Sequence, residues 1–134
     1  NRNNELYTER MNEYQGEKRD NAVNFIELNL MTAQTIDLID PDGNTDTQKV
    51  EANLQQISQR INKLQPGTTP ETQNAVREYQ DAVKEFVAEA RNYIIINSSY
   101  GEAYTQLFIK YNKMINKANS VNMADLDVTE KNKK

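Results

Sequence analysis

Apolar residues recur every three or four positions along most of the chain. The second of four such segments has one narrow stripe, formed by Val50, Leu54, Ile57, Ile61 and Leu64. The later stripes are Val76, Tyr79, Val83, Phe86, Ala90 and Tyr93, then Tyr104, Leu107, Tyr111, Met114, Ala118 and Val121. Side chains three or four residues apart share one face of an α-helix. The pattern therefore predicts helices whose stripes pack together in a bundle.

The first segment is different, because its second half is apolar on nearly every side. Its apolar residues are Val23, Phe25, Ile26, Leu28, Leu30, Met31, Ala33, Ile36, Leu38 and Ile39. A helix that is apolar around its whole circumference is normally enclosed by its neighbours. We therefore expect this half-helix to be the most buried element.

Turn-forming residues separate the four segments. Asp-Pro-Asp-Gly at 40–43 ends the first helix, because a residue before proline avoids the α conformation and Asp-Gly favours a turn. After the second helix, Thr69 is the expected N-cap of a helix that begins at Pro70. The predicted helices are 3–39, 47–65, 70–97 and 100–123, followed by a polar tail at 125–134.

These segments predict a single domain over residues 1–134 with an all-α fold, an antiparallel up-and-down four-helix bundle with a long N-terminal helix. A three-helix bundle is the alternative, in which the last two segments join. At about 1.5 Å per residue, the first helix would be about 55 Å long and the second about 28 Å. Residues 1–20 therefore either pack against tilted neighbours or form a helical stalk.

The run Ile94-Ile-Ile96 is ambiguous by itself, since β-branched runs often form strands. The stripe that starts at Val76 continues through it, which favours the last turn of a helix. Ser99 and Glu102 then have the spacing of a capping box, so a tight helical hairpin is expected here.

Composition excludes several kinds of chemistry. The chain of 134 residues contains no histidine and no cysteine, so Ser-His-Asp, Cys-His, zinc and haem sites cannot be assembled from it. Its four glycines are scattered and provide no phosphate-binding loop. The net charge is −4, with a basic cluster only at 131–134, so we expect no nucleic-acid binding. We therefore expect a protein that is not an enzyme.

One loop has the spacing of calcium ligands. Asp40, Asp42, Asn44, Asp46 and Glu51 stand at positions 1, 3, 5, 7 and 12 of a segment that resembles an EF-hand loop. The sixth position holds threonine where that family has glycine. The two interpretations are a weak calcium site and an ordinary turn with an N-cap. No other cofactor is expected.

A second candidate site consists of four tyrosines around the junction of the last two helices. They are Tyr93, Tyr100, Tyr104 and Tyr111. An aromatic rim at the end of a bundle can contact a ligand or a partner. The alternative is that the rings seal the bundle and leave their hydroxyls in water.

Residues 75–87 and 100–104, AVREYQDAVKEFV and YGEAY, resemble the second helical hairpin of four-helix-bundle extracytoplasmic domains. Bacterial chemoreceptor-type sensors and several small helical lipoproteins have such domains. In a sensor the last helix continues into a membrane span, whereas residues 125–134 are polar. The resemblance therefore implies a lipoprotein or a secreted domain.

We accordingly expect a non-enzymatic, extracytoplasmic domain that contacts another protein or a cell-envelope component. The chain starts at Asn1 rather than at methionine, so we expect that a signal peptide or anchor has been removed. Membrane contact is expected only through that N-terminal anchor. The alternative is a ligand-sensing module with a pocket between helices near the tyrosines. The sequence leaves the oligomeric state open.

Overall fold

The computed structural model describes residues 17–96 and 101–126, and the side chains from Asn21 onwards. Its helices are α2 (Glu17–Leu38), α3 (Thr47–Lys63), α4 (Pro70–Ile96), α5 (Gly101–Asn119) and α6 (Met123–Leu126). No strand occurs within these residues, which confirms the all-α prediction. Tyr100, the Ser99 cap and most of the predicted stalk and polar tail lie outside the described residues.

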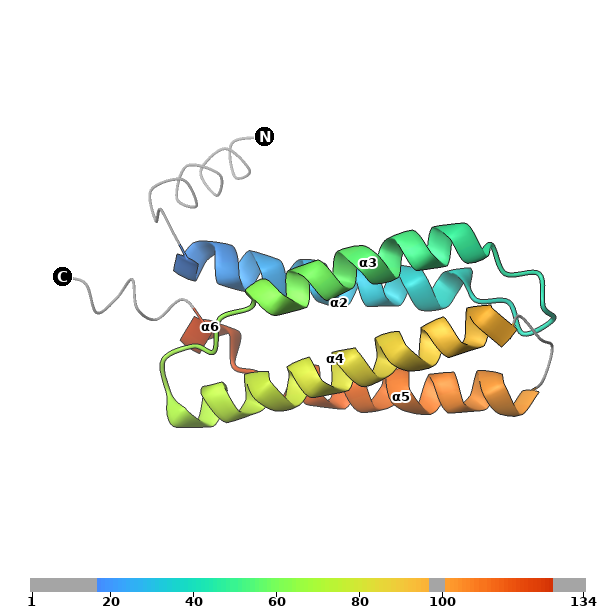
Figure 1. Cartoon of the computed structure of the whole chain (residues 1–134). Helices are drawn as coiled ribbons and strands as arrows, with labels where there is room; N and C mark the ends of the chain where they lie inside the picture. The colour runs from blue at the N-terminus through green and yellow to red at the C-terminus, as the bar shows by residue number, and fades with distance from the viewer. Residues whose placement is uncertain (1–16, 97–100, 127–134) are drawn as a thin grey trace, which may run out of the picture.

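The helices pack side by side along one long axis (Figure 1). Helix α4 contacts both α3 and α5, α2 packs on α3, and the short α6 packs on α2. Successive helices from α2 to α5 alternate in direction (Figure 1). We call the end that contains Glu17 and Leu126 the proximal end. The opposite end, with residues 39–46 and Ile96, is the distal end.

Side-chain caps fix where α3 and α4 begin. A carboxylate oxygen of Asp46 accepts a hydrogen bond from the Lys49 amide at 3.2 Å. The Thr69 hydroxyl accepts one from the Thr72 amide at 3.1 Å, and α4 begins at Pro70 as predicted. These oxygens satisfy amides in the first turn that have no partner within the helix.

A latch near the proximal end connects α6 to the turn before α4. A carboxylate oxygen of Asp125 accepts hydrogen bonds from Thr72 at 2.7 Å and Thr69 at 3.1 Å. Gly67 lies in this turn with φ +90°, and a Cβ there would lie 2.9 Å from the Thr72 methyl group. A side chain at Gly67 would therefore be both strained and crowded.

Helix α4 provides the largest share of the core. Its buried residues are Thr72, Val76, Tyr79, Ala82, Val83, Phe86, Val87, Ala90 and Tyr93. The Tyr79 ring packs edge-on against Phe25, 5.0 Å away, and its hydroxyl donates to the Asn29 amide oxygen at 2.9 Å. Burial raises the Tyr79 pKa far above its ordinary value, so the hydroxyl remains a neutral donor.

The second half of the first helix has a smaller share of exposed positions than the other long helices, as predicted, but it is not enclosed on every side. Ile26 and Leu30 of α2 are 45% and 56% exposed. The buried positions of α2 and the residue just after it are Asn21, Ala22, Phe25, Leu28, Thr32, Thr35, Ile36 and Ile39. Thr32 and Thr35 can be buried because their hydroxyls donate to carbonyls of the preceding turn, at 2.9 and 2.7 Å.

Candidate functional site

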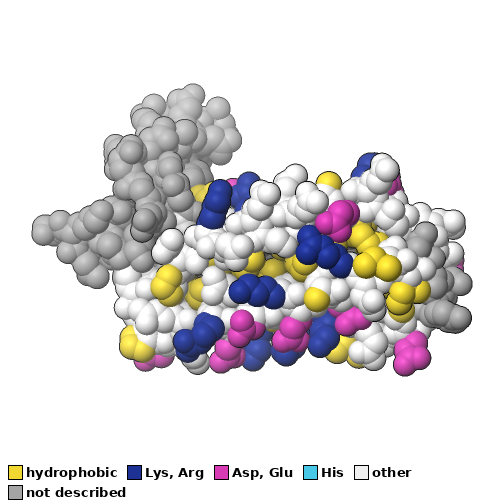
Figure 2. Space-filling model, viewed as in Figure 1, with side chains coloured by type: hydrophobic (Ala, Val, Ile, Leu, Met, Phe, Trp, Pro, Cys, Tyr) yellow, Lys and Arg dark blue, Asp and Glu magenta, His cyan; other side chains and the backbone are white. Residues whose placement is uncertain are grey.

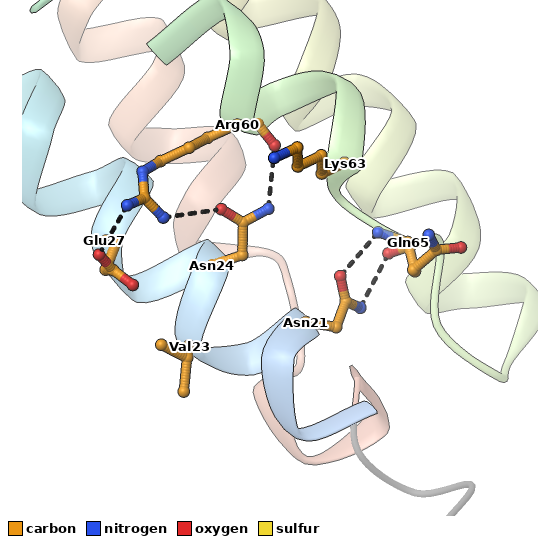
Figure 3. A pocket seen from close by; sticks show the side chains of 7 residues that line it. All are labelled: Asn21, Val23, Asn24, Glu27, Arg60, Lys63 and Gln65. Carbon is orange, nitrogen blue, oxygen red and sulfur yellow. Dashed lines mark hydrogen bonds and ion pairs between the residues drawn. The ribbon is translucent and has the colours of Figure 1, made fainter. Parts of the chain in front are cut away.

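A polar pocket of about 370 Å³ lies between α2 and α3 toward the proximal end (Figure 3). Its lining residues are Asn21, Val23, Asn24, Glu27, Arg60, Lys63 and Gln65. Sequence reasoning predicted none of them as site residues. They come from the first half of α2, from the C-terminal end of α3 and, for Gln65, from the loop that follows α3.

Two asparagines of α2 bind the backbone at the end of α3. The Asn21 side chain accepts a hydrogen bond from the Gln65 amide at 2.6 Å and donates to the Gln65 carbonyl at 3.0 Å. Asn24 donates to the Arg60 carbonyl at 2.9 Å (Figure 3). From the other side, Gln80 of α4 donates to two carbonyls of the same region, each at 3.2 Å. We call these three side chains the amide clamp.

The amide clamp has a structural explanation. The last carbonyls of a helix have no partner within that helix and need donors from elsewhere. Arg60, on the pocket wall, is itself paired with Glu27 at 3.1 Å and with the Asn24 oxygen at 3.5 Å. Five polar residues of the wall are thus bonded in pairs: Asn21 with Gln65, and Asn24 and Glu27 with Arg60. This pairing favours a role in holding α2 against α3 over a role in binding a ligand.

Three of the four predicted tyrosines form part of one aromatic chain between α4 and α5. Tyr93 is buried, and its hydroxyl donates to the Asp40 carbonyl at 3.0 Å. The Tyr104 ring lies 6.3 Å from that of Tyr93 and 4.9 Å from that of Phe108. Tyr100 lies outside the described residues.

The aromatic chain continues along α5. The Tyr111 ring lies 6.2 Å from Phe108 and 5.8 Å from Phe86 of α4. Burial raises the pKa of Tyr93 and of Tyr111 above the ordinary tyrosine value, so neither is poised to act as a base near neutral pH. The rings join the two helices, while their contact with a ligand or partner stays a prediction.

Three of the five candidate calcium ligands, Asp40, Asp46 and Glu51, have other partners in this structure. A carboxylate oxygen of Asp40 accepts from the Asp42 amide at 2.8 Å, as in a local turn. Asp46 caps α3, and Glu51 binds Arg91 of α4 through two hydrogen bonds of 3.3 and 3.2 Å. Over residues 17–96 and 101–126, no three acidic side chains are grouped so as to hold a metal ion. Calcium binding by this loop stays a prediction.

Apolar side chains reach the surface at the distal end. An open groove of about 480 Å³ lies between the first turns of α3 and the last turn of α4. It is lined by Thr47, Gln48, Glu51, Ala52, Gln55, Ile94 and Ile95. Ile95 is 80% exposed, and the adjacent Ile96 is 49% exposed. We call Ala52, Ile94 and Ile95 the distal patch.

The distal end is also strongly acidic. Residues 37–55 contain five carboxylates, Asp37, Asp40, Asp42, Asp46 and Glu51, and one cation, Lys49. Five negative charges and one positive charge give −4, the same as the net charge of the whole chain. The distal loop and the helix turns beside it thus carry a net negative charge, which Arg91 of α4 reduces by pairing with Glu51.

Charges along α4 and α5 are balanced by contrast, and blue and magenta side chains alternate along this side in Figure 2. Glu85 pairs with Lys113 and with Lys110, both at 3.1 Å, and Glu78 pairs with Lys117 at 2.8 Å. Hydrogen bonds from these lysines lower the pKa of Glu85 and of Glu78. This face is a solvated, salt-bridged helix surface.

No family model matches the chain, and neither the curated proteins nor the solved structures contain a significant match. Among the described helices, none is both long and apolar enough to cross a membrane.

Proposed function

We propose that this chain is a non-enzymatic domain, an antiparallel up-and-down four-helix bundle, that acts through protein–protein contacts made at its distal end. The observation that carries the proposal is the distal patch. Ile95 is 80% exposed in a groove whose remaining lining is largely polar. An exposed apolar patch with a polar rim is typical of a surface that binds another macromolecule.

The placement of the patch supports an N-terminally tethered arrangement. Helix α2 begins at the proximal end, whereas the distal patch lies at the opposite end of the bundle (Figure 1). In a lipoprotein anchored through its N-terminal side, the distal patch would face away from the membrane. We propose an extracytoplasmic location on the resemblance of residues 75–87 and 100–104 to helical extracytoplasmic domains. A lipobox cysteine encoded upstream of Asn1 would support the anchor, and a membrane span with a signalling domain encoded after Lys134 would overturn it.

Site-specific photo-crosslinking in the native cell tests the contact itself. A photoreactive benzoylphenylalanine replaces Ile95, and in the control chain it replaces Ile109, a 51% exposed isoleucine of α5. We expect a discrete protein adduct from position 95 that position 109 lacks. The adduct should disappear with Ala52→Glu, which places a charge in the patch, and persist with Gln59→Glu on the same helix. Equal crosslinking at both positions, or none at either, would overturn the proposal.

A further inference from the structure

We infer that the segment that binds the distal patch is a cationic amphipathic one, with apolar side chains on one face and lysine or arginine beside them. This inference rests on the proposed function, because it gives the chemistry of the partner for the same surface.

The shape of the distal patch favours a partner with a row of apolar side chains. Ala52 projects from α3 while Ile94 and Ile95 project from the last turn of α4, so the groove runs between two helices. The groove is shallow and open, so it can accept aliphatic side chains of a partner laid along it. An amphipathic helix presents such side chains in one row, at intervals of three and four residues.

The charges near the groove favour a partner that carries positive side chains. Glu51 lines it, Asp46 precedes the lining residue Thr47, and Asp40 and Asp42 belong to the same distal loop. Glu51 and Arg91 are bonded to each other and offset one another. The negative charge near the groove therefore comes from Asp46 and from Asp40 and Asp42 of the loop. A low-dielectric apolar surface with charges of one sign around it attracts a partner of the opposite sign and repels one of the same sign.

The helix termini at the distal end contribute in the same direction. The last turns of α2 and α4 end there, and neither contains a basic residue that would offset the partial negative charge of a helix C-terminus. The N-termini of α3 and α5, which lie at the same end, are offset by Asp46 and by Glu102. The positive ends are thus neutralised and the negative ends are not.

The charges fit several separate cations better than one metal ion. In the part of the chain that the structure describes, no group of three acidic side chains is arranged around one point. Carboxylates distributed around an apolar groove match lysine or arginine side chains distributed along a peptide. The same field disfavours an anionic phospholipid surface.

The test uses the full chain and three synthetic 14-residue helical peptides that share one leucine row. Their remaining positions are lysine in the first, glutamate in the second and glutamine in the third. Binding is followed by fluorescence anisotropy, and its site is located by amide chemical shifts of the ¹⁵N-labelled chain. We expect the lysine peptide to bind most tightly, to shift residues 47–55 and 94–95, and to bind more weakly as salt rises from 50 to 300 mM.

Two pairs of variants separate the contributions. Ile95→Ser should weaken binding of the lysine peptide about tenfold or more, whereas Ile109→Ser should leave it unchanged. Asp42→Asn removes one charge of the distal loop and should weaken it about two- to threefold at low salt. Asp81→Asn, at an exposed site on α4, should have no effect.

Each contrary result has a definite meaning. If the glutamate or glutamine peptide binds the patch as tightly as the lysine peptide, the inference fails but the proposed function stands. If the affinity of the lysine peptide is the same for Ile95→Ser as for the parent chain, the peptide binds only through nonspecific charge attraction to an acidic surface. That result also overturns the inference. If phosphatidylglycerol vesicles bind the parent chain and Ile95→Ser abolishes that binding, the partner of the patch is a lipid surface, and the inference of a cationic segment is overturned. If no peptide shifts the patch and position 95 gives no adduct in cells, the proposed function fails as well.

Discussion

Replacing Asn21 by alanine tests how much the amide clamp contributes to stability. Asn21 is 2% exposed and makes two hydrogen bonds, of 2.6 and 3.0 Å, to the backbone of Gln65. Each bond contributes about 0.5–1.5 kcal/mol, and the unpaired amide and carbonyl left behind add a desolvation cost. We therefore expect Asn21→Ala to lower the free energy of unfolding by about 2–3 kcal/mol. For a chain of this size the midpoint of thermal unfolding should fall by about 6–12 °C.

Urea unfolding followed by circular dichroism at 222 nm measures this change. Gln34→Ala, at an exposed position of the same helix, is the matched control and should shift the free energy by less than about 0.5 kcal/mol. A similarly small change for Asn21→Ala would refute the reasoning, because it would mean that water replaces both bonds at no cost.

The pH dependence of the stability of Asn21→Asp distinguishes the contributions of the two hydrogen bonds that Asn21 makes to Gln65. Its carboxylate can still accept from the Gln65 amide, but it has no proton to donate to the Gln65 carbonyl. We expect burial of this site and repulsion between these oxygens to outweigh the hydrogen bond from the Gln65 amide, and so to raise the folded-state pKa of the new carboxyl above its ordinary value of about 3.9. Its stabilising contribution is then present below the unfolded-state pKa and is lost as pH rises through the folded-state pKa. The variant should therefore differ least from the parent chain near pH 3 and most near pH 7.

The remaining predictions concern four other features. Asp125→Ala removes the acceptor of the latch and should lower the free energy of unfolding by about 1–3 kcal/mol. Thr72→Val removes only one of the two donors to Asp125 and should show part of this loss. The lowered pKa of Glu85 stabilises the fold above the ordinary carboxyl pKa, and this contribution is lost as pH falls through the folded-state value. Because the pair is exposed, Glu85→Gln should cost under about 1 kcal/mol at pH 7 and nothing at pH 2. If the loop at 40–51 binds calcium, millimolar Ca²⁺ should raise the melting midpoint relative to chelator; an unchanged midpoint would remove that site. Tyr104→Ala, checked for folding by circular dichroism, should retain binding of the lysine peptide if the tyrosines only join α4 to α5.

The sequence predicted α3 and α4 well because their apolar stripes and their buried stripes coincide. Val50, Leu54, Ile57 and Ile61 are all buried, and so are the apolar residues that mark α4 from Val76 onwards. Local turn chemistry at Thr69 predicted the start of α4. These features depend on neighbours in sequence, so a single chain displays them.

The sequence pattern did not reveal which face of α2 is buried, because polarity was taken as a sign of exposure. Its core positions 21, 25, 28, 32, 35 and 39 follow alternating steps of four and three, and three of them are asparagine or threonine. A stripe that admits hydroxyl and amide side chains able to bond the backbone would have revealed this face. Ile26 and Leu30 lie outside that stripe, on another side of the helix, so their apolar character would no longer have been read as a sign of burial.

The candidate sites depended on contacts that the sequence does not reveal. The bonds of Asn21 and Asn24 reach 44 and 36 residues along the chain, so neither spacing nor periodicity indicates them. The position of Ile94 and Ile95 on a helix was predicted from the stripe. That Ile94 packs against the core while Ile95 is exposed follows from the tertiary arrangement around the last turn of α4.

The amide clamp also sets how far α2 can slide along α3. An alternating stripe of four and three steps repeats every seven residues, so sliding by about 10.5 Å would again bring apolar side chains opposite one another. The backbone carbonyls near the end of α3, by contrast, occur only once along its length. Any other alignment would leave them without Asn21 and Asn24. The asparagines therefore select one register among several that hydrophobic packing alone would tolerate.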